Sequence, residues 1–351
     1  MARVSIAWRS RRLIGVAILM GLIAPAQWAP ARAADAALIE AARREGQVNW
    51  YTSSVVDQVV RPAADAFEKL YGIKVNYVRT DGAEVALRVF NEEQAGQVQA
   101  DAFDGFGAPK LVKAGYVLKW QPDSVAHFPP QFFDPNGYWT ATFQMILTPG
   151  YNTDLVPPGT QPKTLQDLLD PKWKGKMAWD SRASNSGAAG FVGMVLHEMG
   201  DDKGKAYLGE LAKQNIASLQ VSARQVLDEV IAGEYSIGLQ IFNHHARISA
   251  DQGAPSAWIP MQPALGVMSV ISITKDAPHP NAGKLLVDFL ASKEGQGLYR
   301  NASYMPVDPA VEPKDPTLRP DGVRFRAIYL SPEEQDEEMP YWSSTYNSIF
   351  R

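Results

Sequence analysis

The chain has 351 residues, of which 46% are hydrophobic and 21% charged, and its formal net charge at pH 7 is −4. It contains no cysteine, which excludes a disulfide framework, a thiolate metal site and a thiol nucleophile. The acidic balance argues against nucleic acid as a partner, because a protein that binds nucleic acid needs a basic surface.

The N-terminus has the pattern of a secretory signal. Arginines precede an apolar run over residues 13–24, and the segment "APARAADAA" follows it. A basic region, a short apolar run and an A-x-A step are typical of a cleaved signal peptide. The run is shorter than the roughly 20 residues that a membrane span needs, so no membrane anchor is expected. We predict a signal peptide over residues 1–33, cleaved after Ala33, and export to the periplasm.

Removal of that segment takes away five arginines and no acidic residue, so the formal charge falls from −4 to −9. A charge of that sign also argues against binding to an anionic membrane surface. The mature chain, residues 34–351, is long enough for two domains.

The first part of the mature chain alternates between strand and helix patterns. The spacing of apolar residues predicts strands over 47–53, 73–82 and 100–107, with helices over 57–72 and 83–95. Such alternation implies a mostly parallel sheet with helices on both faces, whose ligands sit beyond the carboxyl ends of the strands. The candidate ligand contacts at those ends are Tyr51, Thr52, Ser53, Ser54, Arg79, Asp81 and Phe106. Arg79 and Asp81 have turn capping as the alternative role, and Phe106 a place in the core.

The second part repeats this alternation. Strands are predicted over 175–180, 235–243 and 264–274, and helices over 191–200 and 281–299. The segment 306–320 is rich in proline and aspartate, which predicts a surface connection. Further candidate ligand contacts are Arg224, near a predicted helix start, and Asn243 and His244, after a strand. A solvated helix position is the alternative for Arg224. For His244 the alternatives are a metal ligand and a simple strand end.

A run of small and polar residues stands where the strand over 175–180 gives way to a helix. Its members are Ser184, Asn185, Ser186, Gly187 and Ala188. The first N–H groups of a helix have no internal partner and carry about half a positive charge, and small residues let an oxyanion approach them. The run is therefore a predicted anion site, with an ordinary N-cap by Ser184 or Ser186 as the alternative. A nucleophilic Ser186 is not favoured because the G-x-S-x-G pattern is absent, and no catalytic residue is expected.

The segments "TLQDLLDPKWKGKMAWDSRASNSGAAGF" and "DAPHPNAGKLLVDFLASKEGQ" together resemble the ferric-binding-protein-like branch of periplasmic solute-binding proteins, which serve ATP-driven importers. The resemblance implies a type II fold: two doubly wound α/β lobes, joined by two crossing strands, with a central cleft. We expect the crossings near 143–152 and 265–271. On this basis one lobe comprises residues 34–147 and 266–325, and the other comprises 148–265 and 326–351.

Iron-binding relatives hold the metal with a histidine after the first strand, a glutamate in the third-strand loop and a tyrosine pair. The positions that correspond here are Val55, Phe106 and either Phe242 and Asn243 or Asn243 and His244. Neither alternative supplies a tyrosine, and Val and Phe have no donor atom for a hard cation. We therefore expect no metal and no cofactor. Ser186, Gly187 and Ala188 correspond to the segment that holds the anion accompanying iron in those relatives.

The prediction is a monomeric periplasmic substrate-binding component of an ABC transporter, which closes over a small organic anion and delivers it to the inner-membrane permease. A phosphonate or phosphorylated compound is favoured, with a carboxylate next. Ferric iron, a polyamine or a thiamine-type cation are the alternatives within the fold. A periplasmic serine-dependent hydrolase is the alternative from another class.

Overall fold

The computed structural model describes residues 35–105 and 107–351. The predicted signal peptide and Phe106 lie outside the described residues. The helices are α1 (Ala36–Glu45), α2 (Arg61–Tyr71), α3 (Gly82–Ala95), α4 (Ala108–Ala114), α5 (Ala188–Met199), α6 (Asp201–Ala212), α7 (Ala223–Ala232), α8 (Asn243–Asp251), α9 (Pro280–Ala291), α10 (Lys293–Asn301) and α11 (Pro332–Phe350). None of these described helices is both long and apolar enough to cross a bilayer.

Eleven strands of the described chain form one sheet, with the main order β2-β1-β3-β9-β4-β7-β5-β6. The strands are β1 (Gln47–Thr52), β2 (Lys74–Arg79), β3 (Ala102–Asp104), β4 (Thr140–Asn152), β5 (Met177–Asp180), β6 (Ala217–Leu219), β7 (Ile237–Phe242), β8 (Ser256–Trp258), β9 (Ala264–Ile273), β10 (Met305–Pro306) and β11 (Ala327–Tyr329). The short strands β8 and β10 pair with β4, and β11 pairs with β9.

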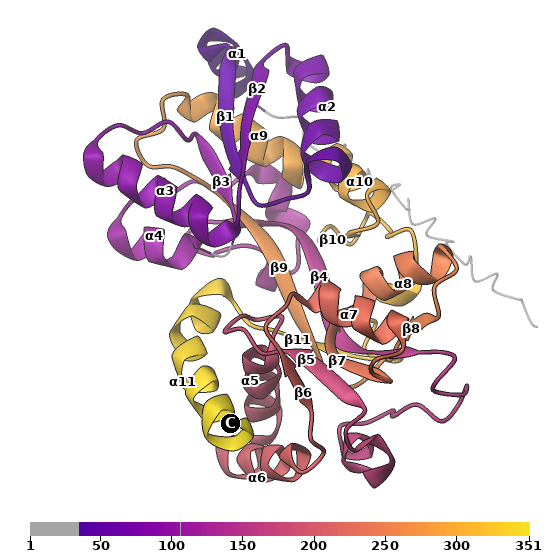
Figure 1. Ribbon diagram of the computed structural model, residues 1–351. Coiled ribbons are helices and arrows are strands. Elements are labelled where there is room, and N and C mark those ends of the chain that lie inside the picture. The colour runs from indigo at the N-terminus through magenta and orange to yellow at the C-terminus, as the bar shows by residue number, and fades with distance from the viewer. Residues whose placement is uncertain (1–34, 106) are drawn as a thin grey trace, which may run out of the picture. The chain divides into compact units, whose positions relative to one another are not determined.

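Two groups of parallel strands flank a central antiparallel pair. β1 is parallel to β2 and β3, and β5 is parallel to β6 and β7. β4 and β9 are antiparallel to each other, and they contain the predicted crossings at 143–152 and 265–271. In Figure 1 these two long strands run from the group with β1 to the group with β5. The chain therefore has two α/β halves connected through one pair of strands.

Each half has its own hydrophobic core. Trp50, Phe67 and Phe289 are buried in one cluster, and Trp179 and Phe191 are buried in another. Burial of large aromatic side chains is the main favourable term for each half, at roughly 25 cal/mol per Å² of apolar surface. The predicted bounds of the two lobes stay a prediction.

Two elements differ from the sequence-based expectation. The predicted helix over 281–299 is two helices, because Ser292 between them accepts a hydrogen bond from the Gly295 N–H and so caps α10. The predicted surface connection over 306–320 is wrong in part, since Val307, Val311 and Leu318 are buried. Apolar residues spaced among prolines pack here without forming a long regular element, so periodicity gives no sign of their burial.

The C-terminal helix α11 is an element that the sequence analysis did not identify. It begins with a capping box, in which the Ser331 and Glu334 side chains each bond to the other's backbone N–H. Trp342 of α11 is buried against α5, where a Cβ on Gly193 would lie 2.4 Å from its indole ring. The absence of a side chain at Gly193 therefore lets the two helices approach closely.

Candidate functional site

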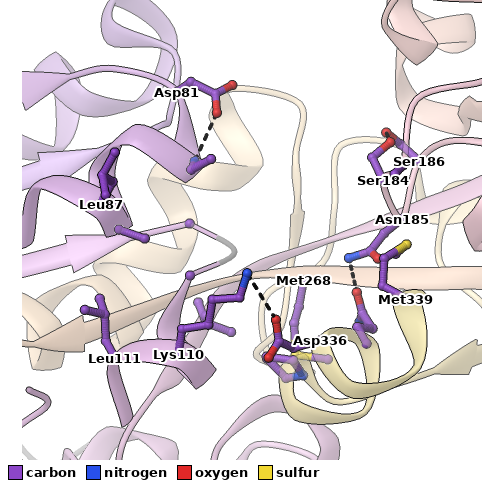
Figure 2. A pocket seen from close by; sticks show the side chains of 18 of the residues that line it. Asp81, Leu87, Lys110, Leu111, Ser184, Asn185, Ser186, Met268, Asp336 and Met339 are labelled. Atoms are coloured by element: carbon purple, nitrogen blue, oxygen red, sulfur yellow. Dashed lines mark hydrogen bonds and ion pairs between the residues drawn. The ribbon is translucent and has the colours of Figure 1, made fainter. Parts of the chain in front are cut away.

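A cleft of about 820 Å³ lies beyond the carboxyl ends of β3 and β5. Its lining comprises Asp81, Ala83, Ala86, Leu87 and Phe90 near α3, Gly105, Gly107, Lys110 and Leu111 near α4, Arg182, Ala183, Ser184, Asn185 and Ser186 after β5, Met268 and Val270 of β9, and Pro332, Gln335, Asp336 and Met339 of α11. This volume lies within the range of small-molecule sites in proteins. Figure 2 shows Leu87 and Leu111 on one side and Ser184, Asn185 and Ser186 on the other.

The loop after β5 leads into an uncapped helix. Gly187 is the N-cap of α5, so neither Ser184 nor Ser186 is the ordinary N-cap, and no side chain of the described residues bonds to the first N–H groups of that helix. The Ser184 and Ser186 hydroxyls lie 3.4 Å from each other. Backbone N–H groups at an uncapped helix start carry partial positive charge and have no hydrogen-bond acceptor within the helix. Gly187 and Ala188, which were predicted as ligand contacts, are buried and do not line the cleft, whereas Ser184, Asn185 and Ser186 do. The part of this loop that lines the cleft therefore ends at Ser186, directly before the N-cap of α5.

Glycines give this loop its tight path. A Cβ on Gly190 would lie 1.9 Å from the Asn185 carbonyl oxygen, and a Cβ on Gly187 would lie 2.5 Å from the Arg182 carbonyl oxygen. No side chain at these two positions fits unless the backbone moves. The glycines of "SNSGAAG" therefore set the position of the serines relative to α5.

Arg182 is the cationic group of this loop. It was not among the predicted ligand contacts, although it lies two residues before Ser184. Its Nε and Nη2 atoms donate to the carboxylate of Asp180, with an Nη2 to Oδ2 distance of 2.8 Å. Asp180 is fully buried, so the pair anchors the guanidinium at the end of β5. The hydrogen bond to Asp180 raises the pKa of Arg182, and the charge of Asp81 acts in the same direction. Among the described residues, no hydrogen bond occupies Nη1, which leaves it able to bind a ligand.

Asp81 lies on the other side of the cleft. Its carboxylate accepts a hydrogen bond of 3.0 Å from the Ala83 N–H and so caps α3. The helix-capping role is thus observed, and Asp81 also lines the cleft.

The helix α11 closes the cleft from a third direction. Lys110 and Lys113 of α4 lie 3.7 and 3.6 Å from the Asp336 carboxylate, and the amide of Asn185 donates to the side-chain oxygen of Gln335. Figure 2 shows the contact between Lys110 and Asp336 and the hydrogen bond of Asn185. Sequence analysis missed these lining residues, although the S-x-x-E pattern at Ser331 marks a helix start.

The predicted ligand contacts after β1 form hydrogen bonds within the protein and do not line the cleft. Thr52 is buried, and both the N–H and the hydroxyl of Ser53 donate to Asp104, at 2.8 and 3.0 Å. The Ser54 N–H donates to the Thr52 hydroxyl. Tyr51 donates to Glu92 at 2.8 Å, and burial with this bond raises its pKa to about 12. None of these four residues lines the cleft described above.

The remaining candidates are also absent from the lining of this cleft. Arg79 is exposed at the end of β2, and Arg224 pairs with Asp228 on α7 at 2.7 Å. Asn243 is buried and donates to the Leu318 carbonyl at 2.9 Å. His244 is buried at the start of α8, and its Nε2 has no partner among the described residues.

The positions that correspond to iron ligands in relatives do not form a cluster of donors. Val55 is exposed, and Phe242 is partly buried beside the hydrophobic core. In residues 35–105 and 107–351, no group of three or more histidine, aspartate or glutamate side chains is placed to hold a metal ion.

The comparisons with known proteins agree on one class. Residues 101–328 match the model of a family described as bacterial extracellular solute-binding protein. A Salmonella typhimurium protein named "Putative 2-aminoethylphosphonate-binding periplasmic protein" is 29% identical over 87% of this chain and 86% of its own length.

Solved structures share the fold. Iron-bound HitA from Pseudomonas aeruginosa has a TM-score of 0.71 at 21% identity, covering 86% of this chain and 99% of that one. The periplasmic binding protein AfuA from Actinobacillus pleuropneumoniae, with fructose-6-phosphate bound, has a TM-score of 0.71 at 23% identity, covering 87% and 98%. The predicted type II architecture of two α/β lobes and two crossing strands is therefore confirmed. The chain belongs to the bacterial extracellular solute-binding proteins, and it is a ferric-binding-protein-like substrate-binding component of an ABC importer.

Proposed function

We propose that this protein captures a small organic anion in the cleft, with a phosphonate or phosphorylated compound favoured and a carboxylate next. The observation that carries the proposal is the loop over residues 182–186, which lines the cleft directly before the start of α5. Its guanidinium and its serine hydroxyls together suit a tetrahedral or planar oxyanion.

The comparisons support this class of ligand. The name of the Salmonella relative includes 2-aminoethylphosphonate, and the AfuA structure holds a sugar phosphate. Both compounds carry a phosphorus-centred oxyanion. The two proteins differ in the rest of their ligand, so they support the acidic group and leave the remainder of the molecule open.

The proposed cycle follows the behaviour of periplasmic binding proteins. Binding closes the two lobes by a hinge motion, and the closed form docks on the permease of the inner membrane. We propose that the protein acts as a monomer in the periplasm, after removal of the predicted signal peptide. The Ser184 to Ser186 loop and Leu87 of α3 lie on opposite sides of the cleft, so closure would bring both toward one ligand.

A hydrolase is the second candidate, and the surroundings of Ser186 do not favour it. Its hydroxyl has the Ser184 hydroxyl as its one hydrogen-bond partner among the described residues. A serine nucleophile needs a base within hydrogen-bond reach. The family consists of transport proteins, and we propose that this member has no catalytic activity.

A thermal-shift screen tests the function. Residues 34–351 are unfolded and refolded to remove bound ligand, then mixed with phosphonates, sugar phosphates, carboxylates, polyamines, thiamine or ferric citrate. A ligand at 100 times its Kd adds about 2.7 kcal/mol of stability, which raises Tm by several degrees. We expect a rise with at least one phosphorus oxyanion.

Two serine variants give a matched control. Ser186→Ala removes a hydroxyl from the cleft and should reduce the rise, whereas Ser54→Ala, at a position outside the cleft lining, should leave it unchanged. A rise with ferric citrate alone contradicts the proposal. Turnover of a phosphate ester that is lost in Ser186→Ala would support the hydrolase instead.

A further inference from the structure

Much of the cleft away from the loop after β5 is apolar. Leu87 and Phe90 come from α3, Leu111 from α4, Met268 from β9 and Met339 from α11. We refer to these five side chains as the apolar wall. The helices α3 and α4 are near each other in sequence, but β9 and α11 are distant from them, so the tertiary structure brings these side chains to one concave surface.

Leu87 is the most accessible member of this wall, with 60% of its surface exposed. Single exposed leucines are ordinary on protein surfaces. Leu87, however, lines a cavity together with four other large apolar side chains. An apolar concavity with a few polar groups at one end is the usual form of a small-molecule site.

The acidic side chains of the cleft already have partners. Asp336 lies within 3.7 Å of Lys110 and 3.6 Å of Lys113, and Asp81 caps α3. These carboxylates are therefore less available to a cationic group of a ligand. The cleft offers donors for one acidic group and apolar surface for the rest of the molecule.

We propose that the preferred ligand is an organic acid whose phosphonate or carboxylate carries an apolar body, such as an aryl or branched alkyl group, and that Leu87 is a residue that determines this specificity. The inference rests on the proposed function, because the acidic group must bind beside Arg182 and Ser186. An apolar body that covers Leu87 removes apolar surface from water, which stabilises the complex.

Calorimetric titration of refolded residues 34–351 compares three probes: benzylphosphonate, methylphosphonate and 2-aminoethylphosphonate. Benzylphosphonate should bind at least about tenfold more tightly than methylphosphonate, from burial of its ring. Phenylacetate and acetate provide the same comparison for a carboxylate.

A pair of leucine variants isolates the apolar wall. Leu87→Ala should weaken benzylphosphonate binding by about five- to tenfold and leave methylphosphonate binding unchanged. Leu70→Ala is the matched control, because Leu70 is 47% exposed on α2 and does not line the cleft. That variant should bind both probes like the unmodified chain.

The outcomes separate this inference from the proposed function. Equal affinity for benzylphosphonate and methylphosphonate, or tighter binding of 2-aminoethylphosphonate than of benzylphosphonate, overturns the inference and leaves anion capture standing. An equal loss for both probes in Leu87→Ala also overturns the role of Leu87. If no phosphonate or carboxylate of the set binds, this inference fails. The proposed function fails with it only if the sugar phosphates of the thermal-shift screen also give no rise in Tm.

Discussion

Two serine-containing loops at strand ends have opposite surroundings in this protein. After β1, the Ser53 N–H and hydroxyl are both bonded to the buried carboxylate of Asp104. After β5, the buried carboxylate of Asp180 is bonded by Arg182, and the serines line the cleft. The two loops differ in the residue that donates hydrogen bonds to the buried carboxylate, which is Ser53 after β1 and Arg182 after β5. Where an arginine does so, the serine hydroxyls of the loop remain available for a ligand.

The largest expected effect concerns the loop after β1. Asp104→Ala would leave the Trp50 indole N–H and both donors of Ser53 without their acceptor. An unsatisfied buried donor costs roughly 1–3 kcal/mol, so we expect a loss of about 4 kcal/mol in the free energy of unfolding. Urea unfolding measures it, with Asp57→Ala at an exposed position as the control. A loss below about 1 kcal/mol would mean that water replaces the carboxylate.

A third strand end, after β7, contains two histidines whose burial makes the stability of the protein depend on pH. His244 and His245 follow that strand, with ring centroids 4.3 Å apart, and burial lowers the pKa of both, that of His245 to about 4. The charge of Arg224 lowers the pKa of His245 further, and that of Asp228 raises it.

A lowered pKa in the folded state means that the unfolded chain binds more protons in acid. The stability from neutral His245 is therefore complete above pH 6.5 and is lost as the pH falls toward 4, by about 3 kcal/mol. Unfolding in urea at several pH values should show a smaller acid loss for His245→Gln than for the unmodified chain. Parallel curves for the two proteins would contradict this assignment. Raised pKa values of Asp101 and Asp104 act in the opposite direction in both proteins, so the difference between the curves is the informative quantity.

Gly190→Ala should displace the loop over residues 182–186 that follows β5. Its Cβ would lie 1.9 Å from the Asn185 carbonyl oxygen, which forces the serines away from α5. We expect a loss of about 2 kcal/mol in stability, as for overpacked cores, together with loss of the ligand-induced rise in Tm. Gly209→Ala in α6 is the matched control, since its Cβ meets open space and alanine favours a helix. Retained binding in Gly190→Ala would show that the loop geometry is not needed.

The smallest effect is expected at the ion pairs between α4 and α11. Lys113 lies 3.2 Å from Glu337 and 3.6 Å from Asp336, and all three side chains contact water. Exposed ion pairs are screened by water, so a double-mutant cycle with Lys113→Ala and Asp336→Ala should show almost no coupling in the urea midpoint. A larger coupling would identify α11 as a helix that the ion pairs hold against the cleft.

Six of the eleven described strands could be predicted from local patterns, whereas β4 was expected only from the resemblance. The strand over 47–53 and the helix over 83–95 correspond closely to β1 and α3, because alternating strands and amphipathic helices have a local periodicity. The boundary between α9 and α10 could not be predicted from the spacing of apolar residues, because apolar residues continue on both sides of Ser292.

The site was predictable in part. Asp81, Ser184, Asn185 and Ser186 line the cleft. The other described candidates do not: the four residues after β1, Arg79, Gly187, Ala188, Arg224, Asn243 and His244. Arg182 was overlooked because an arginine beside an aspartate is equally typical of a surface pair. The residues of α11 were overlooked because nothing local indicates that a C-terminal helix returns to a cleft formed by other elements.

The sequence by itself determined the family, the alternation of strands and helices, and the small-residue run before α5, since each depends on short segments of chain. Only the tertiary structure decided which of the two serine-containing loops lines the cleft, and which apolar side chains line it as well. Those outcomes depend on where Asp104, Asp180 and α11 come to lie, and such long-range placement follows from packing of the whole chain.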